Sequence, residues 1–215
     1  MVMKSRNDHL ETLNEIRSMM ERSSRFISLS GLSGVAAGTT ALIGAAIVYW
    51  YLELVPFSGK LLFSLRNLTS SKWGLGFIDF IYLDAIGVML VALASGIFFT
   101  TRKARKRGLR VWDKLTARLL INLSIPMITG GIFCIALINY KAWALIAPAT
   151  LIFYGLALLH GSKYTLHDIR YLGISEIILG SIALFIPGYG LEFWTIGFGV
   201  LHIVYGLVMY NKYEK

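Results

Sequence analysis

The chain has 215 residues, of which 56% are hydrophobic and only 15% are charged, and its mean hydropathy is +0.64. This composition excludes an ordinary soluble domain, and several apolar runs of about 20 residues predict a membrane protein. The formal charge of +9 does not indicate a nucleic-acid partner, because membrane proteins collect lysine and arginine on their cytoplasmic side. The single cysteine, Cys134, excludes an intrachain disulfide and a multi-cysteine metal site.

Residues 1–25 predict a retained amphipathic helix on the cytoplasmic side of the membrane. Acids and bases alternate there with apolar residues that recur every three or four positions, which is not typical of a cleavable signal peptide. Two interpretations stay open: the helix lies on lipid headgroups or on its own bundle, or it binds a partner protein. The partner-binding stripe in the second interpretation is Leu10, Leu13, Ile16 and Met20.

Six apolar segments follow, and they predict an all-α polytopic membrane bundle of six transmembrane helices arranged as three helical hairpins. We expect the transmembrane domain at 26–210, with spans at about 26–51, 77–100, 119–138, 142–160, 171–186 and 191–210, and a cytoplasmic tail at 211–215. The fifth span is the shortest. Pro126 and Pro148 fall inside spans and predict bends rather than breaks. Two interpretations of the apolar loop 53–72 stay open: an ordinary loop that lies on the membrane surface, or an interfacial or re-entrant segment.

The positions of the basic residues predict the orientation of these spans. Seventeen of the 21 lysines and arginines fall on the side that holds both termini, so both termini are expected in the cytoplasm. The densest basic run lies beside the second span, and we predict that it binds anionic lipid headgroups. Its members are Arg102, Lys103, Arg105, Lys106, Arg107 and Arg110.

A weak internal repeat relates the hairpins. Tyr154-Gly155-Leu156 matches Tyr205-Gly206-Leu207 at an offset of 51, and Ser124 and Trp143 match Ser175 and Trp194 at the same offset. The first hairpin fits loosely, since Gly31, Ser33, Gly38, Ala41 and Leu42 resemble Gly173, Ser175, Gly180, Ala183 and Leu184. Either the hairpins descend from one ancestral pattern, or tight hairpins share these residues for physical reasons alone.

Three ionisable side chains fall deep inside different spans: Asp84, Glu176 and His202. Each costs about 2.5 to 3.5 kcal/mol to insert, so each is a candidate functional residue. If they meet in the bundle interior, they form a site for protons or cations; alternatively, each hydrogen-bonds across a helix interface and stabilises packing. Glu192 lies nearer the outer surface and is expected to reach outward.

Ser30, Gly34 and Gly38 form a stripe of small residues on the first span, which predicts close helix packing within the bundle or against a second copy of the chain. No spacing typical of a metal site, a nucleotide loop or a catalytic elbow occurs. We therefore expect no cofactor, no metal, no nucleic-acid partner and no enzyme activity.

The segment from Asn14 to Gly44, which begins NEIRSMMERSSRFISLSGLSG, resembles an uncharacterised family of small bacterial multispanning inner-membrane proteins. The resemblance implies a bacterial inner-membrane location and no particular activity. Two functions follow from the residues. The favoured one is a non-enzymatic regulatory or assembly subunit that binds a partner through its N-terminal helix and bundle surface. The alternative is a small proton- or cation-coupled transporter.

Overall fold

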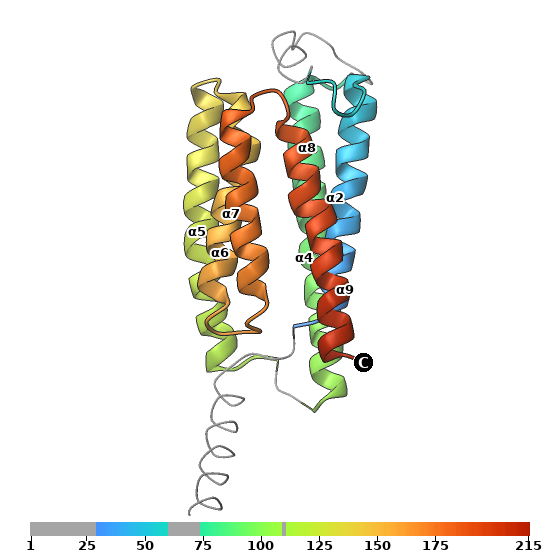
Figure 1. Cartoon of the computed structure of the whole chain (residues 1–215), viewed down its shortest axis with the longest axis vertical. Helices are drawn as coiled ribbons and strands as arrows, with labels where there is room; N and C mark the ends of the chain where they lie inside the picture. The colour runs from blue at the N-terminus through green and yellow to red at the C-terminus, as the bar shows by residue number, and fades with distance from the viewer. Residues whose placement is uncertain (1–28, 60–73, 109–110) are drawn as a thin grey trace, which may run out of the picture.

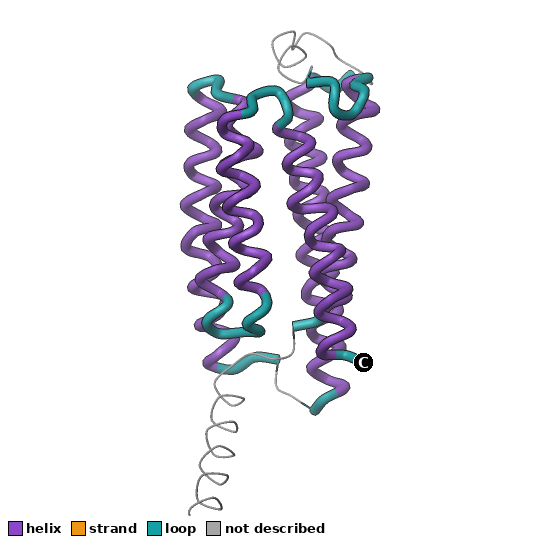
Figure 2. Tube along the Cα trace, viewed as in Figure 1, coloured by secondary structure: helices purple, strands orange, loops and turns teal. Residues whose placement is uncertain are grey.

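The computed structural model describes residues 29–59, 74–108 and 111–215, and its regular structure is helical (Figures 1 and 2). Five helical segments of this part are long and apolar enough to cross a membrane, so the chain is a multi-pass membrane protein, as its composition predicts. They are α2 (Gly31–Leu52), α4 (Phe77–Lys106), α5 (Lys114–Asn139), the segment Trp143–Gly161 and the segment Gly190–Tyr213.

Two of these segments change helix type along their length. Trp143–Gly161 begins with a 3₁₀ turn, η1 (Trp143–Leu145), and continues as α6 (Ile146–Gly161). Gly190–Tyr213 consists of α8 (Gly190–Trp194), a π-helix η2 (Thr195–Leu201) and α9 (His202–Tyr213). Pro126 does not end α5, and Pro148 lies in the first turn of α6, where its missing N–H has no intrahelical partner to lose.

Helix α7 (Ile169–Phe185) has 17 residues and is about 25 Å long by the helical rise. It is shorter than the other five segments, as expected for the predicted fifth span, and it lies beside α6 along the bundle (Figure 1).

The helices form two groups of three. Helices α5, α6 and α7 pack together. Helix α2 packs against α4 and against the continuous helical segment Gly190–Tyr213, which we call the α8–α9 rod (Figure 1). Contacts of α8 with α6 and α7 join the groups. Helix α4 packs on α2, and no comparable contact joins α4 to α5 within the described residues.

The two ends of the bundle differ in charge. The end that holds the C-terminus and the α4–α5 and α6–α7 connections carries nearly all described lysines and arginines, and we call it the basic end; the opposite end is the loop end (Figure 1). At the basic end, Lys212 Nζ and the Tyr213 hydroxyl donate hydrogen bonds of 2.7 and 2.8 Å to Asp168. Partial burial raises the pKa of Asp168, but these hydrogen bonds outweigh burial and leave it below its usual value. This contact ties the end of α9 to the start of α7.

Two helix crossings use the same close approach. At the α6–α7 crossing, a Cβ atom added to Gly173 would lie 2.8 Å from the carbonyl oxygen of Gly155. At the α2–α9 crossing, a Cβ atom added to Gly31 would lie 2.5 Å from the carbonyl oxygen of Gly206. Gly155 and Gly206 are the pair related by the offset of 51, so the repeat seen in the sequence has a matching contact in space.

The match continues two turns further along both crossings. A Cβ atom added to Gly180 would lie 2.8 Å from Cγ1 of Ile152, and one added to Gly38 would lie 2.7 Å from Cγ1 of Ile203. The two isoleucines are again 51 residues apart. In both cases the second helix of one hairpin packs on the first helix of another, which favours the interpretation of three related hairpins.

The stripe of small residues lies inside the bundle. Gly34 faces the backbone of Gly206 and His202, Gly38 faces η2 and α9, and Ser30 donates to the Glu214 carboxylate. These positions are therefore used for packing within one chain.

Several helix bounds differ from the predicted spans. Helix α4 continues to Lys106 instead of ending at 100, and α5 begins at Lys114 instead of 119, because lysine and arginine favour helix beyond the hydrocarbon. The predicted N-terminal helix with Leu10, Leu13, Ile16 and Met20, much of the loop 53–72, and Arg110 lie outside the described residues.

Candidate functional site

Glu176 and His202 meet in the interior of the bundle. Glu176 lies on α7 and is fully buried, and His202 begins α9 and is 6% exposed. The distance from His202 Nδ1 to Glu176 Oε1 is 3.5 Å. The structure thus brings two of the three predicted site residues together from different hairpins.

The imidazole ring of His202 has a polar partner at each nitrogen. Nδ1 lies 3.0 Å from the carbonyl oxygen of Gly197, and Nε2 lies 2.8 Å from the hydroxyl of Tyr154. A neutral ring that donates from Nδ1 to the carbonyl accepts the Tyr154 O–H at Nε2.

The π-helix η2 creates the first of these contacts. A π-helix widens the backbone spiral, and this feature is frequent at functional sites. Gly197 lies in η2, five residues before His202, so its carbonyl is within reach of the histidine ring. Gly197 also leaves room for the acid, since a Cβ atom added there would lie 2.5 Å from Glu176 Oε2.

Both carboxyl oxygens of Glu176 are buried, and neither has a hydrogen-bond partner among the described residues. A bare carboxylate in such a place costs several kcal/mol. Glu176 therefore requires a proton, a bound cation or a charged His202 beside it.

Aromatic rings pack around His202. Phe198 stacks on His202 at a centroid distance of 5.8 Å and also contacts Tyr154 at 5.0 Å. Neither Tyr154 nor Phe198 is predicted as a site residue from the sequence, although Tyr154 belongs to the Tyr-Gly-Leu repeat.

A cavity of about 240 Å³ connects this site to the basic end. Tyr154 and His202 line its inner part, and Ser30, Ser33 and Thr165 line the part toward the basic end. Glu176 does not line the cavity itself, but it lies 3.5 Å from His202, which does.

Asp84 does not join the pair. It lines a second cavity of about 290 Å³ on the loop-end side, and neither Glu176 nor His202 lines that cavity. The predicted meeting of all three residues is therefore not observed, because α4 packs on α2 and not on the helices that carry Glu176 and His202.

Glu192 differs from the sequence expectation. It is 6% exposed rather than directed outward, and its Oε1 accepts a 3.1 Å hydrogen bond from the backbone N–H of Phe57. The carboxylate fastens the segment after α2 to the α8–α9 rod.

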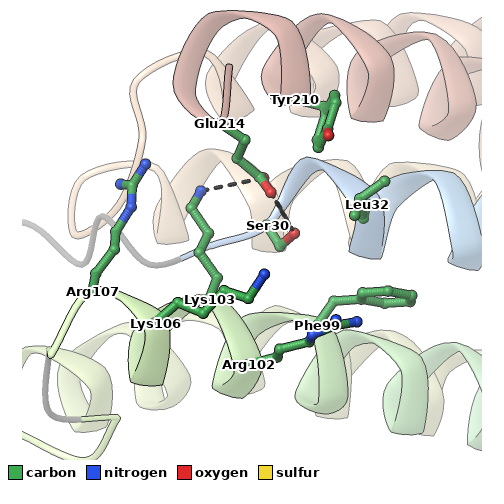
Figure 3. A pocket seen from close by; sticks show the side chains of 9 residues that line it. All are labelled: Ser30, Leu32, Phe99, Arg102, Lys103, Lys106, Arg107, Tyr210 and Glu214. Carbon is green, nitrogen blue, oxygen red and sulfur yellow. Dashed lines mark hydrogen bonds and ion pairs between the residues drawn. The ribbon is translucent and has the colours of Figure 1, made fainter.

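A basic pocket of about 290 Å³ lies between the ends of α2, α4 and α9 (Figure 3). Lys103 is 8% exposed, and its Nζ donates to the Leu29 carbonyl at 2.6 Å and lies 3.3 Å from Glu214. Glu214 also accepts from Ser30 and from the N–H of Gly31. Lys103 thus helps to pack α4 against α2 and the C-terminal end of α9, and headgroup binding by its side chain stays a prediction.

The other described members of the basic run have exposed side chains. Arg102, Lys106 and Arg107 line the pocket in Figure 3, and Arg105 is exposed beside it. Arg107 also donates to the Tyr213 carbonyl at 2.6 Å. Headgroup binding by these four residues stays a prediction.

Within residues 29–59, 74–108 and 111–215, no group of three or more histidines, cysteines and acids is placed to hold a metal ion. Comparison of the chain with models of known protein families, with curated proteins and with solved structures finds no match.

Proposed function

We propose that the chain is a small ion-coupled membrane carrier in which Glu176 and His202 handle the coupling proton. The observation that carries this proposal is the fully buried Glu176 carboxyl, which has no hydrogen-bond partner in the described part of the chain and lies 3.5 Å from His202. Ionisable groups inside membrane bundles are typical of proton relays and ion pathways.

The geometry supplies a route for the proton. Glu176 takes the Nδ1 proton of His202, and Nε2 recovers a proton through the Tyr154 hydroxyl from the cavity toward the basic end. The net change is one proton moved from the cavity to the carboxyl. The reverse sequence returns it, so that the site alternates between a neutral acid and a carboxylate, each beside a neutral histidine, and a carboxylate beside a charged histidine is the intermediate between them.

We also propose that α7 is the sixth span and that both termini lie in the cytoplasm of a bacterial inner membrane. Helix α7 has apolar side chains that are exposed on the surface of the bundle and are compatible with lipid, including Ile178, Ile182 and Phe185. The concentration of lysine and arginine at one end supports the orientation.

The test measures proton movement in proteoliposomes that hold a pH-sensitive dye and an imposed pH gradient. We expect at least one of Na⁺, K⁺ and tetraphenylphosphonium, added in turn, to dissipate the gradient with the wild-type protein and not with Glu176→Gln. Asp79→Asn is the matched control, because Asp79 is an exposed acid on α4, and it should behave as wild type.

Two results would contradict the proposal. One is that no added cation moves protons through folded wild-type protein. The other is that Glu176→Gln, shown to be folded by its thermal unfolding, moves protons at the wild-type rate.

The regulatory-subunit hypothesis stays a prediction, because Leu10, Leu13, Ile16 and Met20 lie outside the described residues. It predicts a stoichiometric partner, or a second copy of the chain, on purification in mild detergent. Changing Leu13→Glu together with Ile16→Lys should remove that partner and leave proton movement intact.

A further inference from the structure

The bundle is open along one of three equivalent seams. The α6–α7 and α9–α2 crossings are closed by matched glycine contacts, and the third equivalent crossing would join α4 to α5. Glycines are present on both of these helices, but a Cβ atom added to Gly87 or Gly131 would meet nothing within 4 Å among the described residues. The seam between α4 and α5 is therefore not closed by helix packing.

The cavity beside Asp84 lies along this seam. Its walls come from α4 on one side and from Ile138 of α5 and the start of α6 on the other, and α2 and α8 complete the lining with Ala45, Val48, Leu191 and Trp194. Two wall residues on α4, Ile78 and Tyr82, are themselves 39% and 45% exposed. The cavity thus borders the lipid between α4 and α5, and a molecule dissolved in the bilayer can reach it sideways.

Among the described residues that line this cavity, Asp84 is the only acid, and none is a base. Within the part of the chain that the structure describes, no hydrogen bond or ion pair of Asp84 is present. Gly44 of α2 lies close to the Asp84 carboxylate, since a Cβ atom added to Gly44 would be 3.4 Å from Asp84 Oδ2. The carboxylate thus lies close to α2 and has no counter-charge among the described residues.

The remaining lining determines what kind of cation fits. Aromatic side chains of Trp143, Trp194 and Tyr82 provide ring surfaces that attract cations. An inorganic cation needs several oxygen ligands, and the only hydroxyl-bearing aliphatic residue of the lining, Thr150, donates to the Ala147 carbonyl of its own helix. An apolar, aromatic site with one carboxylate matches an organic cation.

We infer that this cavity binds a lipophilic organic cation, which enters from the bilayer between α4 and α5 and pairs with Asp84. The inference names the cargo class of the proposed carrier and to that extent rests on the proposed function. Binding itself requires Asp84 and the aromatic walls, and it does not require Glu176.

The test measures equilibrium binding of tetraphenylphosphonium to the full-length protein in lipid nanodiscs, with tetraphenylborate as the probe of nearly equal shape and opposite charge. Wild type should bind the cation, and Asp84→Asn should bind it about tenfold more weakly or worse, as expected for the loss of one partly desolvated charge pair. Asp79→Asn, five residues earlier on the same helix, should bind as wild type. Binding of the borate should not fall in Asp84→Asn.

A second variant tests the cavity without changing charge. Ala85 lines the cavity and is exposed on α4, so Ala85→Trp should fill the space and weaken cation binding while the helix remains intact. Equal binding of the cation to wild type and Asp84→Asn would overturn the inference. Binding of the cation and the borate that weakens equally in Asp84→Asn would also overturn it.

The two proposals fail in different ways. Asp84-dependent binding without any Glu176-dependent proton movement would refute the carrier and leave the cation site standing. Proton movement driven by Na⁺ or K⁺ and dependent on Glu176, with no Asp84-dependent binding of the organic cation, would refute the cation site and leave the carrier standing.

Discussion

Gly197 occupies a position where any larger residue would press on the Glu176 carboxyl. A Cβ atom added there would lie 2.5 Å from Glu176 Oε2 and 2.5 Å from a Leu151 methyl group. We predict that Gly197→Ala displaces the carboxyl, slows proton movement in proteoliposomes several-fold, and costs about 1–3 kcal/mol of stability through overpacking.

Gly131→Ala is the control for this variant, because a Cβ atom at Gly131 meets nothing within 4 Å. It should leave both the rate and the melting temperature near wild type. Wild-type proton movement by Gly197→Ala would show that the position of the Glu176 carboxyl does not matter.

Asp113 caps the start of α5, outside the membrane span. Its Oδ1 accepts hydrogen bonds of 2.7 Å from the backbone N–H of Thr116 and 2.8 Å from the Thr116 hydroxyl, and the backbone bond lowers the pKa of Asp113 below its usual value. Because the folded-state pKa is the lower one, the stabilisation is complete above the unfolded pKa of about 3.9 and disappears as the pH falls through the folded pKa.

We therefore predict that Asp113→Ala lowers the stability of the protein by about 1 kcal/mol at neutral pH. The difference in melting temperature between this variant and wild type should persist down to about pH 4 and shrink below it. A difference that grows on acidification would contradict the capping role.

At the scale of single residues, the sequence identified part of the site. The cost of burying an ionisable group singled out Glu176 and His202, and the structure places them together. Tyr154 has no such cost, so nothing in the sequence assigned it to His202. Glu192 was expected outward because of its depth, but a backbone N–H from the distant residue Phe57 holds it inside, and such a partner is not visible from spacing.

The glycine crossings determine how the helices assemble. Gly155 and Gly206 each lie within contact distance of the backbone of the next hairpin, where a Cβ atom cannot be accommodated without moving a helix. We predict that Gly155→Ala and Gly206→Ala each lower the melting temperature in detergent by several degrees, at a cost of about 1–3 kcal/mol.

Gly87→Ala provides the contrast on α4. No atom lies within 4 Å of the added Cβ, so the substitution should leave the protein unchanged or slightly more stable, through the higher helix propensity of alanine. Equal melting temperatures for Gly155→Ala, Gly206→Ala and Gly87→Ala would show that the close contacts at the glycine crossings do not stabilise the bundle.

At the scale of helices, the sequence predicted the order and approximate limits of the membrane segments. The π-helix η2 was not predicted, because its apolar sequence is also compatible with an ordinary α-helix and only the surrounding contacts distinguish the two. The repeat was visible in the sequence. The residues that match between hairpins do not show, however, that α4 and α5 lack the close packing found at the other two crossings.

The whole molecule has one strongly basic end, which predicts its orientation. We expect the C-terminus in the cytoplasm and the α5–η1 turn on the opposite side. In a Cys134→Ala background, a membrane-impermeant maleimide should label intact cells carrying Tyr140→Cys and not those carrying Lys215→Cys. Both positions are exposed at opposite ends of the bundle. The reverse labelling pattern would invert the topology and the assignment of the cavities to the two sides.

The composition and the distribution of charge indicated a polytopic membrane protein, and five spans are long and apolar enough to confirm that class. Whether Asp84 would join Glu176 and His202 was not predictable, because depth in the membrane does not specify which helices are neighbours.

The most direct test of the central claim records the ¹⁵N resonances of the histidine side chains in labelled full-length protein, with His202→Gln identifying the signals of that residue. The geometry predicts a neutral His202 ring protonated at Nδ1, with an Nε2 signal that moves in Tyr154→Phe and an Nδ1 signal that moves in Glu176→Gln. His202 signals that are unchanged in both variants would show that the three side chains do not form one proton-exchanging unit.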